Sequence, residues 1–251
     1  MSDTGTAPAR FDIGRVASQT FTVVRRNLLP FLPLGAIAAA PNAYFTLAIA
    51  TKTIDPKSGG PFLAAAFGAL LVGFLFTIVM QTIVTQRTIG TLSRQPTPFG
   101  SLLAMGLRQF FPLLAINLME GIALTFGLLL LIVPGLMLFA MWLVVAPARI
   151  VEGTGIFASF SRSASLTSGY RWPAFGTIVV YYIGAASAQF SVRPAAGVVL
   201  SDGVFWAYIG IDTLVGGVVA VGAAVVSACI YYELRVIKEG VGPEQVADVF
   251  G

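Results

Sequence analysis

Six long apolar stretches, each almost free of charged residues, constrain this chain more than any other feature of its sequence. A helix needs about 20 mostly apolar residues to cross the roughly 30 Å hydrocarbon core of a bilayer. Only 10% of the residues are charged and 57% are apolar, whereas soluble domains carry about 25% charged residues. The sequence therefore predicts an all-α polytopic membrane protein with six transmembrane helices, at residues 28–50, 62–84, 110–133, 136–150, 172–190 and 205–232.

The boundary between the third and fourth stretches depends on one dipeptide, Pro134-Gly135. Proline fixes φ and glycine accepts positive φ, so this pair is typical of a tight turn. The apolar segment 110–150 is too long to be a single kinked span, so a helical hairpin is the better interpretation. The six helices are then expected to form three hairpins.

The basic residues predict the orientation of these hairpins, because lysine and arginine concentrate in cytoplasmic loops. With the N-terminus in the cytoplasm, twelve of the fifteen basic residues lie inside, and only Lys52, Lys57 and Arg193 lie outside. We therefore expect a multi-pass protein of the bacterial inner membrane with both termini cytoplasmic. Its parts would be a disordered N-terminus (1–10), the membrane domain (11–235) and a cytoplasmic tail (236–251). Because the basic residues form no single patch, no nucleic-acid partner is predicted.

A signal peptide is a competing interpretation of the N-terminal region. Arg25-Arg26, the apolar segment 28–37 and then Ala38-Ala39-Ala40 follow the order of basic region, apolar region and cleavage site. The apolar run continues to Ala50, which favours a transmembrane helix.

Each span that would leave the cytoplasm is preceded by a short amphipathic stretch that ends in an arginine followed by a proline. Such a helix can lie in the headgroup layer with its arginines near lipid phosphates, although ordinary connecting loops would also satisfy the orientation rule. The apolar faces are Ile13, Ala17, Phe21, Val24 and Leu28; then Phe99, Leu102 and Leu103 after Thr97-Pro98; then Ile156, Phe157 and Phe160 between a Thr154 cap and a Gly169 stop. The predicted partners are the bilayer and its anionic headgroups, contacted by Arg15, Arg25, Arg26, Arg108, Arg162 and Arg171.

Small and polar residues recur every fourth position in three of the apolar stretches. Such ridges allow helix backbones to approach closely, and their polar members can hydrogen-bond across the seam. We expect the three ridges to face each other: Ala65, Ala69, Gly73, Thr77, Gln81 and Thr85; Asn117, Gly121 and Thr125, with Glu120 beside them; and Asp212, Gly216, Ala220, Ala224 and Ala228.

Charged and amide side chains at membrane depth are costly, so Gln81, Asn117, Glu120 and Asp212 are the candidate polar-core or ligand-binding residues. Glu120 could bind a substrate or a proton, or it could be a structural carboxyl bonded to Asn117, Gln81 or the backbone. The structural role is favoured, because no basic residue at membrane depth is available to neutralise Glu120. Asp212 lies near the outer end of its helix, where it can reach water.

Catalysis is not predicted. The chain has no histidine and one cysteine, Cys229, which excludes histidine-based chemistry and thiolate metal clusters. All three lysines lie outside the spans, so no base is available to activate an intramembrane serine. We expect no cofactor and no metal. At the C-terminal side, Arg235 and Glu239 should form an i,i+4 ion pair, Gly240 should end the last helix, and a short amphipathic helix should follow Pro243.

Four segments resemble a bacterial family of integral-membrane proteins whose domain also forms the membrane part of some glycerophosphodiester phosphodiesterases. The resemblance implies a six-span membrane domain more firmly than an activity. The chain lacks the histidine and acidic cluster of the phosphodiesterase site, so that activity is not transferred. The matching segments are Val133-Pro134-Gly135 and the residues 146–153, 160–172 and 231–240.

Two functions follow from these features. The favoured hypothesis is a non-enzymatic membrane protein that organises lipid or a partner membrane protein. The alternative is a small transporter or permease with a midplane polar cavity around Glu120. Two observations weigh against transport: few intramembrane polar groups, and no broken helix at the midplane apart from Pro41 in the first span.

Overall fold

The computed structural model describes residues 11–95, 98–198 and 202–240, and these contain helices but no strand. The predicted N-terminal disorder and the helix after Pro243 lie outside the described residues. Besides a short 3₁₀ turn at Pro56–Ser58, the helices are α1 (Ile13–Arg26), α2 (Leu28–Ala50), α3 (Gly60–Leu92), α4 (Phe99–Leu130), α5 (Ile132–Trp142), α6 (Val145–Glu152), α7 (Ile156–Thr167), α8 (Arg171–Val198) and α9 (Asp202–Glu239).

Five segments of the described chain are long and apolar enough to cross a membrane, which supports an all-α membrane protein. They are Leu28–Ala50, Gly60–Leu92, Gly100–Leu130, Ile132–Glu152 and Trp206–Glu239. The fifth predicted span lies in α8, whose 28 residues would extend about 42 Å at the rise of an α-helix. Helix α8 is not among these five segments of the described residues.

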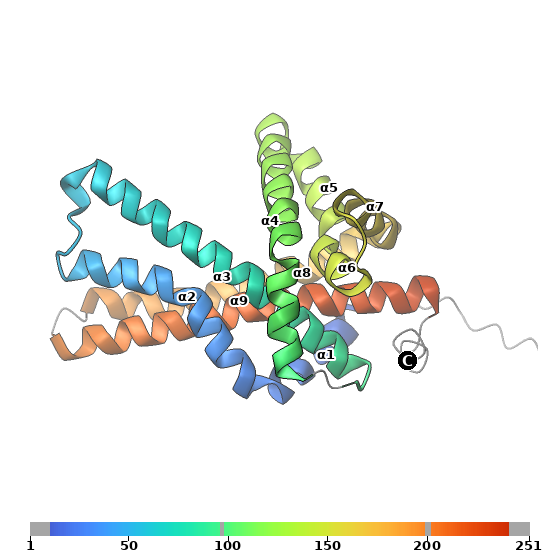
Figure 1. Ribbon diagram of the computed structural model, residues 1–251, viewed down its shortest axis with the longest axis horizontal. Coiled ribbons are helices and arrows are strands. Elements are labelled where there is room, and N and C mark those ends of the chain that lie inside the picture. Colours follow the sequence, from blue (N-terminus) through green and yellow to red (C-terminus); the bar gives the residue numbers. More distant parts are fainter. Residues whose placement is uncertain (1–10, 96–97, 199–201, 241–251) are drawn as a thin grey trace, which may run out of the picture.

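Helix α9 is the central element of the fold (Figure 1), and α2 makes the most extensive contact with it. Half of the most apolar window of α9 is buried inside the protein, against 11% for α3. Residues 224–234 of α9 supply much of the main core, which also contains Val16 of α1, Phe31 of α2 and Leu166 of α7. In Figure 1 the α2–α3 and α8–α9 pairs extend to the left, whereas α4 and α5 extend upward.

The α2–α9 contact depends on two glycines, Gly35 and Gly217. A Cβ atom built on Gly35 would lie 2.6 Å from the carbonyl oxygen of Gly217, and one built on Gly217 would lie 2.5 Å from the carbonyl carbon of Gly35. Small residues permit such backbone contact between helices. Neither glycine belongs to the predicted ridges, and Gly216, which does, has no neighbouring atom within 4 Å of a built Cβ.

The predicted turn at Pro134-Gly135 is wrong by three residues. Leu131, in extended conformation, is the turn between α4 and α5, and Pro134 and Gly135 lie in the first turn of α5. Proline is tolerated there because the first helical N–H groups have no intrahelical acceptor. Gly135 is required for packing instead: a Cβ built on it would lie 2.8 Å from the backbone nitrogen of Leu128.

The tip of the α4–α5 hairpin is entirely apolar. Residues 129–133 are all Leu, Ile or Val and are 63–79% exposed. Two backbone hydrogen bonds join the turn to its helices: the Leu131 N–H donates to Gly127 O (3.1 Å), and Leu131 O accepts from the Gly135 N–H (3.3 Å). A hydrogen-bonded turn without polar side chains suits lipid hydrocarbon better than water.

Two of the three short helices predicted before the spans are present as separate helices, α1 and α7, whereas the second is not. Helix α1 stands apart from α2, begins after an Asp12 cap and ends before Asn27. Helix α7 ends at Thr167, and Gly169 follows with φ of +83°, as predicted, although its N-cap is Gly155 and not Thr154. Residues 99–130 form one continuous helix, so no separate interfacial helix precedes the third span, and Thr97 lies outside the described residues. Helix α4 continues past Pro112, although this proline lacks the N–H that would donate to the carbonyl of Arg108.

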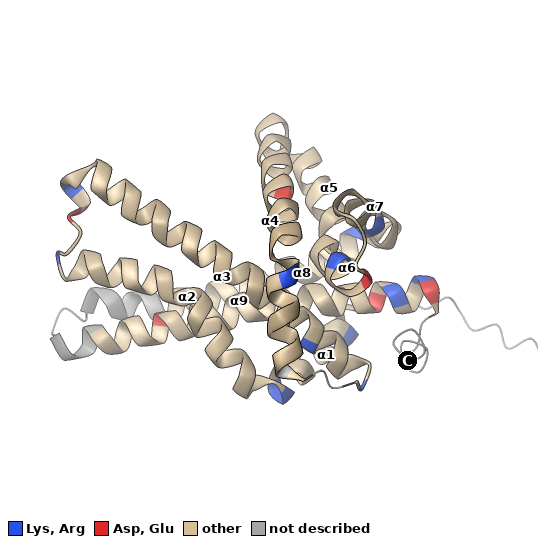
Figure 2. Cartoon of the chain, viewed as in Figure 1, with Lys and Arg blue, Asp and Glu red and all other residues tan. Residues whose placement is uncertain are grey.

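Charged residues lie mainly at the ends of the apolar helices (Figure 2). Lys52 and Lys57 occupy the connection between α2 and α3. Most other charges of the described chain lie on α1, α6, α7 and the C-terminal part of α9, and the ribbon between these two regions is almost free of them. This separation is expected when the middle of a helix lies in hydrocarbon.

Candidate functional site

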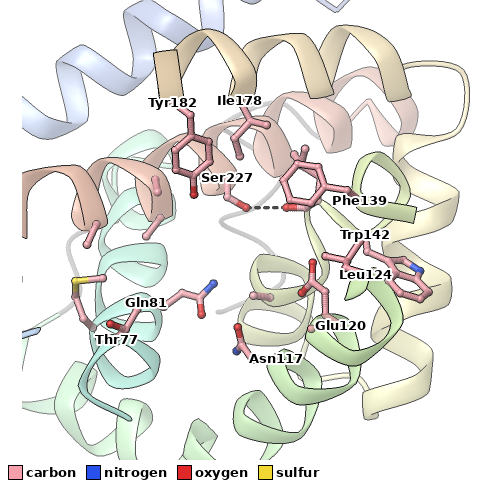
Figure 3. A pocket seen from close by; sticks show the side chains of 17 residues that line it. Thr77, Gln81, Asn117, Glu120, Leu124, Phe139, Trp142, Ile178, Tyr182 and Ser227 are labelled. Carbon is pink, nitrogen blue, oxygen red and sulfur yellow. Dashed lines mark hydrogen bonds between the residues drawn. The ribbon is translucent and has the colours of Figure 1, made fainter. Parts of the chain in front are cut away.

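A cavity of about 490 Å³ lies where α3, α4, α5, α8 and α9 meet (Figure 3). Its polar lining comes from three helices: Thr77 and Gln81 of α3, Asn117 and Glu120 of α4, and Ser227 of α9. Three aromatic side chains, Phe139, Trp142 and Tyr182, complete its wall. We call this space the Glu120 cavity.

The predicted ridges meet around this cavity and do not pack tightly against each other. Gln81, Asn117 and Glu120 are brought together as expected, and Figure 3 shows their side chains around one open space. Gly121 also lines it, with no atom within 4 Å of a built Cβ. Asp212 is not among the lining residues. The ridges therefore border a partly open cavity, because their small residues leave its volume unfilled.

The hydrogen bonds expected for a structural carboxyl are not formed. Asn117 Nδ2 donates to the carbonyl of Leu113 in its own helix (2.8 Å), not to Glu120. Neither Glu120 nor Gln81 makes a side-chain hydrogen bond or an ion pair with the described residues. Because Asn117 uses its amide nitrogen on its own backbone, its carbonyl oxygen is left to act as an acceptor in the cavity.

A helix break borders the cavity, and the sequence interpretation of 136–150 as one span missed it. Helix α5 ends at Trp142 and α6 begins at Val145. Pro147 lacks the N–H that would bind the carbonyl of Leu143 within a continuous helix. The hydroxyl of Ser227 donates to that carbonyl instead (2.9 Å). The signal in the sequence was Pro147 itself, which interrupts an otherwise apolar helical segment.

Three further hydrogen bonds stabilise the backbone at the break. Ser163 of α7 accepts from the Val144 N–H (3.3 Å) and donates to the Met141 carbonyl (2.9 Å). Thr167 donates to the same carbonyl (3.2 Å). Side-chain hydroxyls from two other helices thus satisfy the backbone groups that the interruption frees, which is a requirement for irregular backbone at membrane depth.

An ion-pair network fastens α7 to α6 and α9. Arg162 Nε lies 2.8 Å from Glu152, and a second guanidinium nitrogen of Arg162 contacts Glu239. The predicted Arg235–Glu239 pair is confirmed at 2.8 Å. Tyr231 OH donates to Glu152 (2.8 Å). Burial opposes ionisation of Arg162, but hydrogen bonds to Glu239 and Glu152 and the charges of both carboxylates outweigh it and raise the pKa of Arg162.

The six arginines predicted to contact lipid have different surroundings. Arg15 forms an ion pair with the buried Glu233 (3.1 Å) and Arg162 belongs to the network above, so both have protein partners that sequence reasoning missed. Arg25, Arg26 and Arg108 are exposed, and Arg171 is half-buried. Lipid contact by any of these arginines stays a prediction.

No group of three or more histidine, cysteine or acidic side chains in the described part of the chain is placed to hold a metal ion. Comparisons of the chain with protein-family models, curated proteins and solved structures give no match. The resemblance to the phosphodiesterase-associated membrane family therefore stays a prediction.

Proposed function

We propose that this protein is a non-enzymatic transporter or permease of the bacterial inner membrane that binds a small ligand in the Glu120 cavity. In this proposal six membrane-inserted segments form three hairpins, and both termini are cytoplasmic. The observation that carries the proposal is the coincidence of unpartnered polar side chains with a helix break at one cavity. The sequence alone favoured lipid or partner organisation, partly because it showed few intramembrane polar groups and no helix break other than the one at Pro41.

The cost of polar groups in a membrane supports this role. Carboxyl and amide groups at membrane depth are expensive, and by default they face a bundle interior or a water-filled cavity where they find partners. Glu120 and Gln81 have no protein partner among the described residues. A purely structural pair would gain free energy by bonding to each other or to backbone. Their open arrangement favours a partner supplied by a ligand or by water.

The helix break supports the same role. Binding sites of membrane transporters are commonly formed by discontinuous helices, because the freed backbone can be exposed only where it lines a cavity. Phe139, Trp142 and Leu143 at the end of α5, and Ala146 at the start of α6, all line the Glu120 cavity.

The test uses two matched carboxamide variants, Glu120→Gln and Asp212→Asn. Both remove one carboxylate from an apolar helix, but Asp212 does not line the cavity. Each protein is extracted directly from cells into lipid nanodiscs and analysed by native mass spectrometry. We expect a bound small molecule on the wild type and on Asp212→Asn, and its loss from Glu120→Gln.

Size-exclusion profiles and thermal unfolding of the same samples separate binding from folding. Retained monodispersity with lost ligand supports the proposal. If Glu120→Gln alone aggregates or loses thermal stability while no bound molecule is found on the wild type, Glu120 is structural and the proposal is wrong.

A second candidate function, lipid organisation, is favoured by α1. The residues that α1 buries against the protein are Val16 and Val23, whereas Phe21 is 69% exposed. Its exposed apolar side therefore faces away from the protein, next to exposed Arg25 and Arg26. An amphipathic helix with an exposed apolar side beside exposed arginines can enter the headgroup layer.

This second candidate predicts that the double variant Arg25→Gln/Arg26→Gln retains fewer anionic lipids after detergent extraction. The matched control is Lys52→Gln/Lys57→Gln, which removes the same charge from the α2–α3 connection. Equal retention of phosphatidylglycerol by both double variants, measured by lipid mass spectrometry, would argue against it.

A further inference from the structure

We infer that the occupant of the Glu120 cavity is an organic cation, such as an alkyl or aryl ammonium ion. This inference rests on the proposed function, because it names the chemical class of the ligand bound at that site. Its basis is the juxtaposition of one carboxylate, two amide side chains and three aromatic rings in a single cavity without a basic residue.

The charge of the lining selects the sign of the ligand. Glu120 is the only acidic residue among the seventeen that line the cavity, and no lysine or arginine belongs to them. Electrostatic interactions strengthen as the local dielectric constant falls, so an anion inside would be strongly repelled by the carboxylate. A cation is attracted, and it supplies the counter-charge that the apolar spans lack.

The uncharged polar groups act in the same direction. The free carbonyl oxygen of Asn117 is an acceptor, because its amide nitrogen already donates to Leu113. This acceptor favours a ligand that donates hydrogen bonds.

The aromatic wall favours an organic cation over a metal ion. Phe139, Trp142 and Tyr182 line the cavity, and aromatic faces attract ammonium groups through cation–π interactions. A volume of about 490 Å³ falls within the range of small-molecule pockets, roughly 300–1,000 Å³. Calcium and magnesium ions need about six or more oxygen ligands, and the cavity offers one carboxylate and a few amide and hydroxyl oxygens.

The experiment compares two probes of nearly equal size and shape but opposite charge, tetraphenylphosphonium and tetraphenylborate. Binding of each to the full chain in lipid nanodiscs is measured by equilibrium dialysis, and empty nanodiscs of the same lipid give the partitioning background. We expect saturable binding of tetraphenylphosphonium to the wild type and to Asp212→Asn. Tetraphenylborate should show only the background of the empty nanodiscs.

The variants Glu120→Gln and Glu120→Asp test the role of the carboxylate. We expect Glu120→Gln to weaken tetraphenylphosphonium binding at least tenfold, and Glu120→Asp, which keeps the charge, to retain most of it. Unchanged affinity in Glu120→Gln would overturn the inference. If neither variant folds, the comparison of the two probes on the wild type still decides the sign of the ligand.

The outcomes separate this inference from the proposed function. A cellular molecule that is found on the wild type and lost from Glu120→Gln, together with saturable binding of tetraphenylborate, would leave the proposed function standing and refute the cation. Absence of a cellular ligand and of saturable binding for either probe would refute both.

Discussion

Substitution of Gly217 by alanine tests the central packing contact of the fold, between α2 and α9. An added Cβ would lie 2.5 Å from the carbonyl carbon of Gly35, 2.7 Å from its oxygen and 3.0 Å from the nitrogen of Ala36. All three atoms belong to the backbone, so no side-chain rotation can relieve the clash and the helices must separate. Overpacking of this kind costs about 1–3 kcal/mol.

The neighbouring residue provides the control, because a Cβ on Gly216 meets no atom within 4 Å. Both substitutions bring the same gain in helix propensity, roughly 1 kcal/mol, which cancels in the comparison. The free energy of unfolding of Gly217→Ala should therefore be about 1–3 kcal/mol below that of Gly216→Ala. This difference corresponds to roughly a 5- to 150-fold change in the unfolding equilibrium constant.

The assay is reversible unfolding in mixed micelles, with sodium dodecyl sulfate as denaturant and circular dichroism as the signal. Gly35→Ala should reproduce the loss, because its Cβ would lie 2.6 Å from the Gly217 carbonyl oxygen. Equal unfolding free energies for Gly217→Ala and Gly216→Ala would show that the α2–α9 contact does not depend on Gly217.

Three further predictions concern the break, the ion-pair network and the hairpin tip. Ser227→Ala leaves the Leu143 carbonyl unpaired, so it should lower the free energy of unfolding by about 1 kcal/mol. It should also speed amide hydrogen exchange selectively at residues 143–145. Unchanged exchange there would contradict the role given to the Ser227 hydroxyl. Arg162→Gln separates α7 from two carboxylates and should cost about 1–2 kcal/mol in the same unfolding assay, with no effect expected if α7 is held by apolar contacts alone. In a Cys229→Ser background, a cysteine that replaces Leu131 should resist labelling by a membrane-impermeant maleimide. A cysteine that replaces Lys57 should react with the same reagent from outside the cell. Rapid labelling at position 131 would place the hairpin tip in water.

The sequence predicted the membrane class and much of the helix pattern because both depend on local sums of hydropathy. Helix α2 has the predicted bounds of 28–50, and the predicted second span lies within α3. The pairing of Arg235 with Glu239 and the stop at Gly240 were equally local, since they depend on helical spacing and on positive φ. The N-terminal amphipathic stretch was likewise visible as a helix before α2.

Other features were misjudged because a sequence motif does not reveal its neighbours. Pro134-Gly135 has the composition of a turn, but Gly135 is needed for close contact with Leu128. The second amphipathic stretch merges with the span after it, because nothing between Phe99 and Leu130 ends the helix. Gly35 and Gly217, which contact each other, belong to none of the three ridges that the four-residue periodicity identified.

The sequence likewise predicted some features of the candidate site, and the tertiary structure decided the others. Scarcity of charge, the absence of histidine and the few intramembrane polar residues singled out Gln81, Asn117 and Glu120 from the sequence. Only the tertiary structure decided that they surround a cavity, that Asp212 stands apart from it, and that a broken helix forms part of its wall. Composition and spacing are local properties of the sequence. Ser227, however, donates to the carbonyl of Leu143 from 84 residues away along the chain. Only the packing of the helices brings these two residues together.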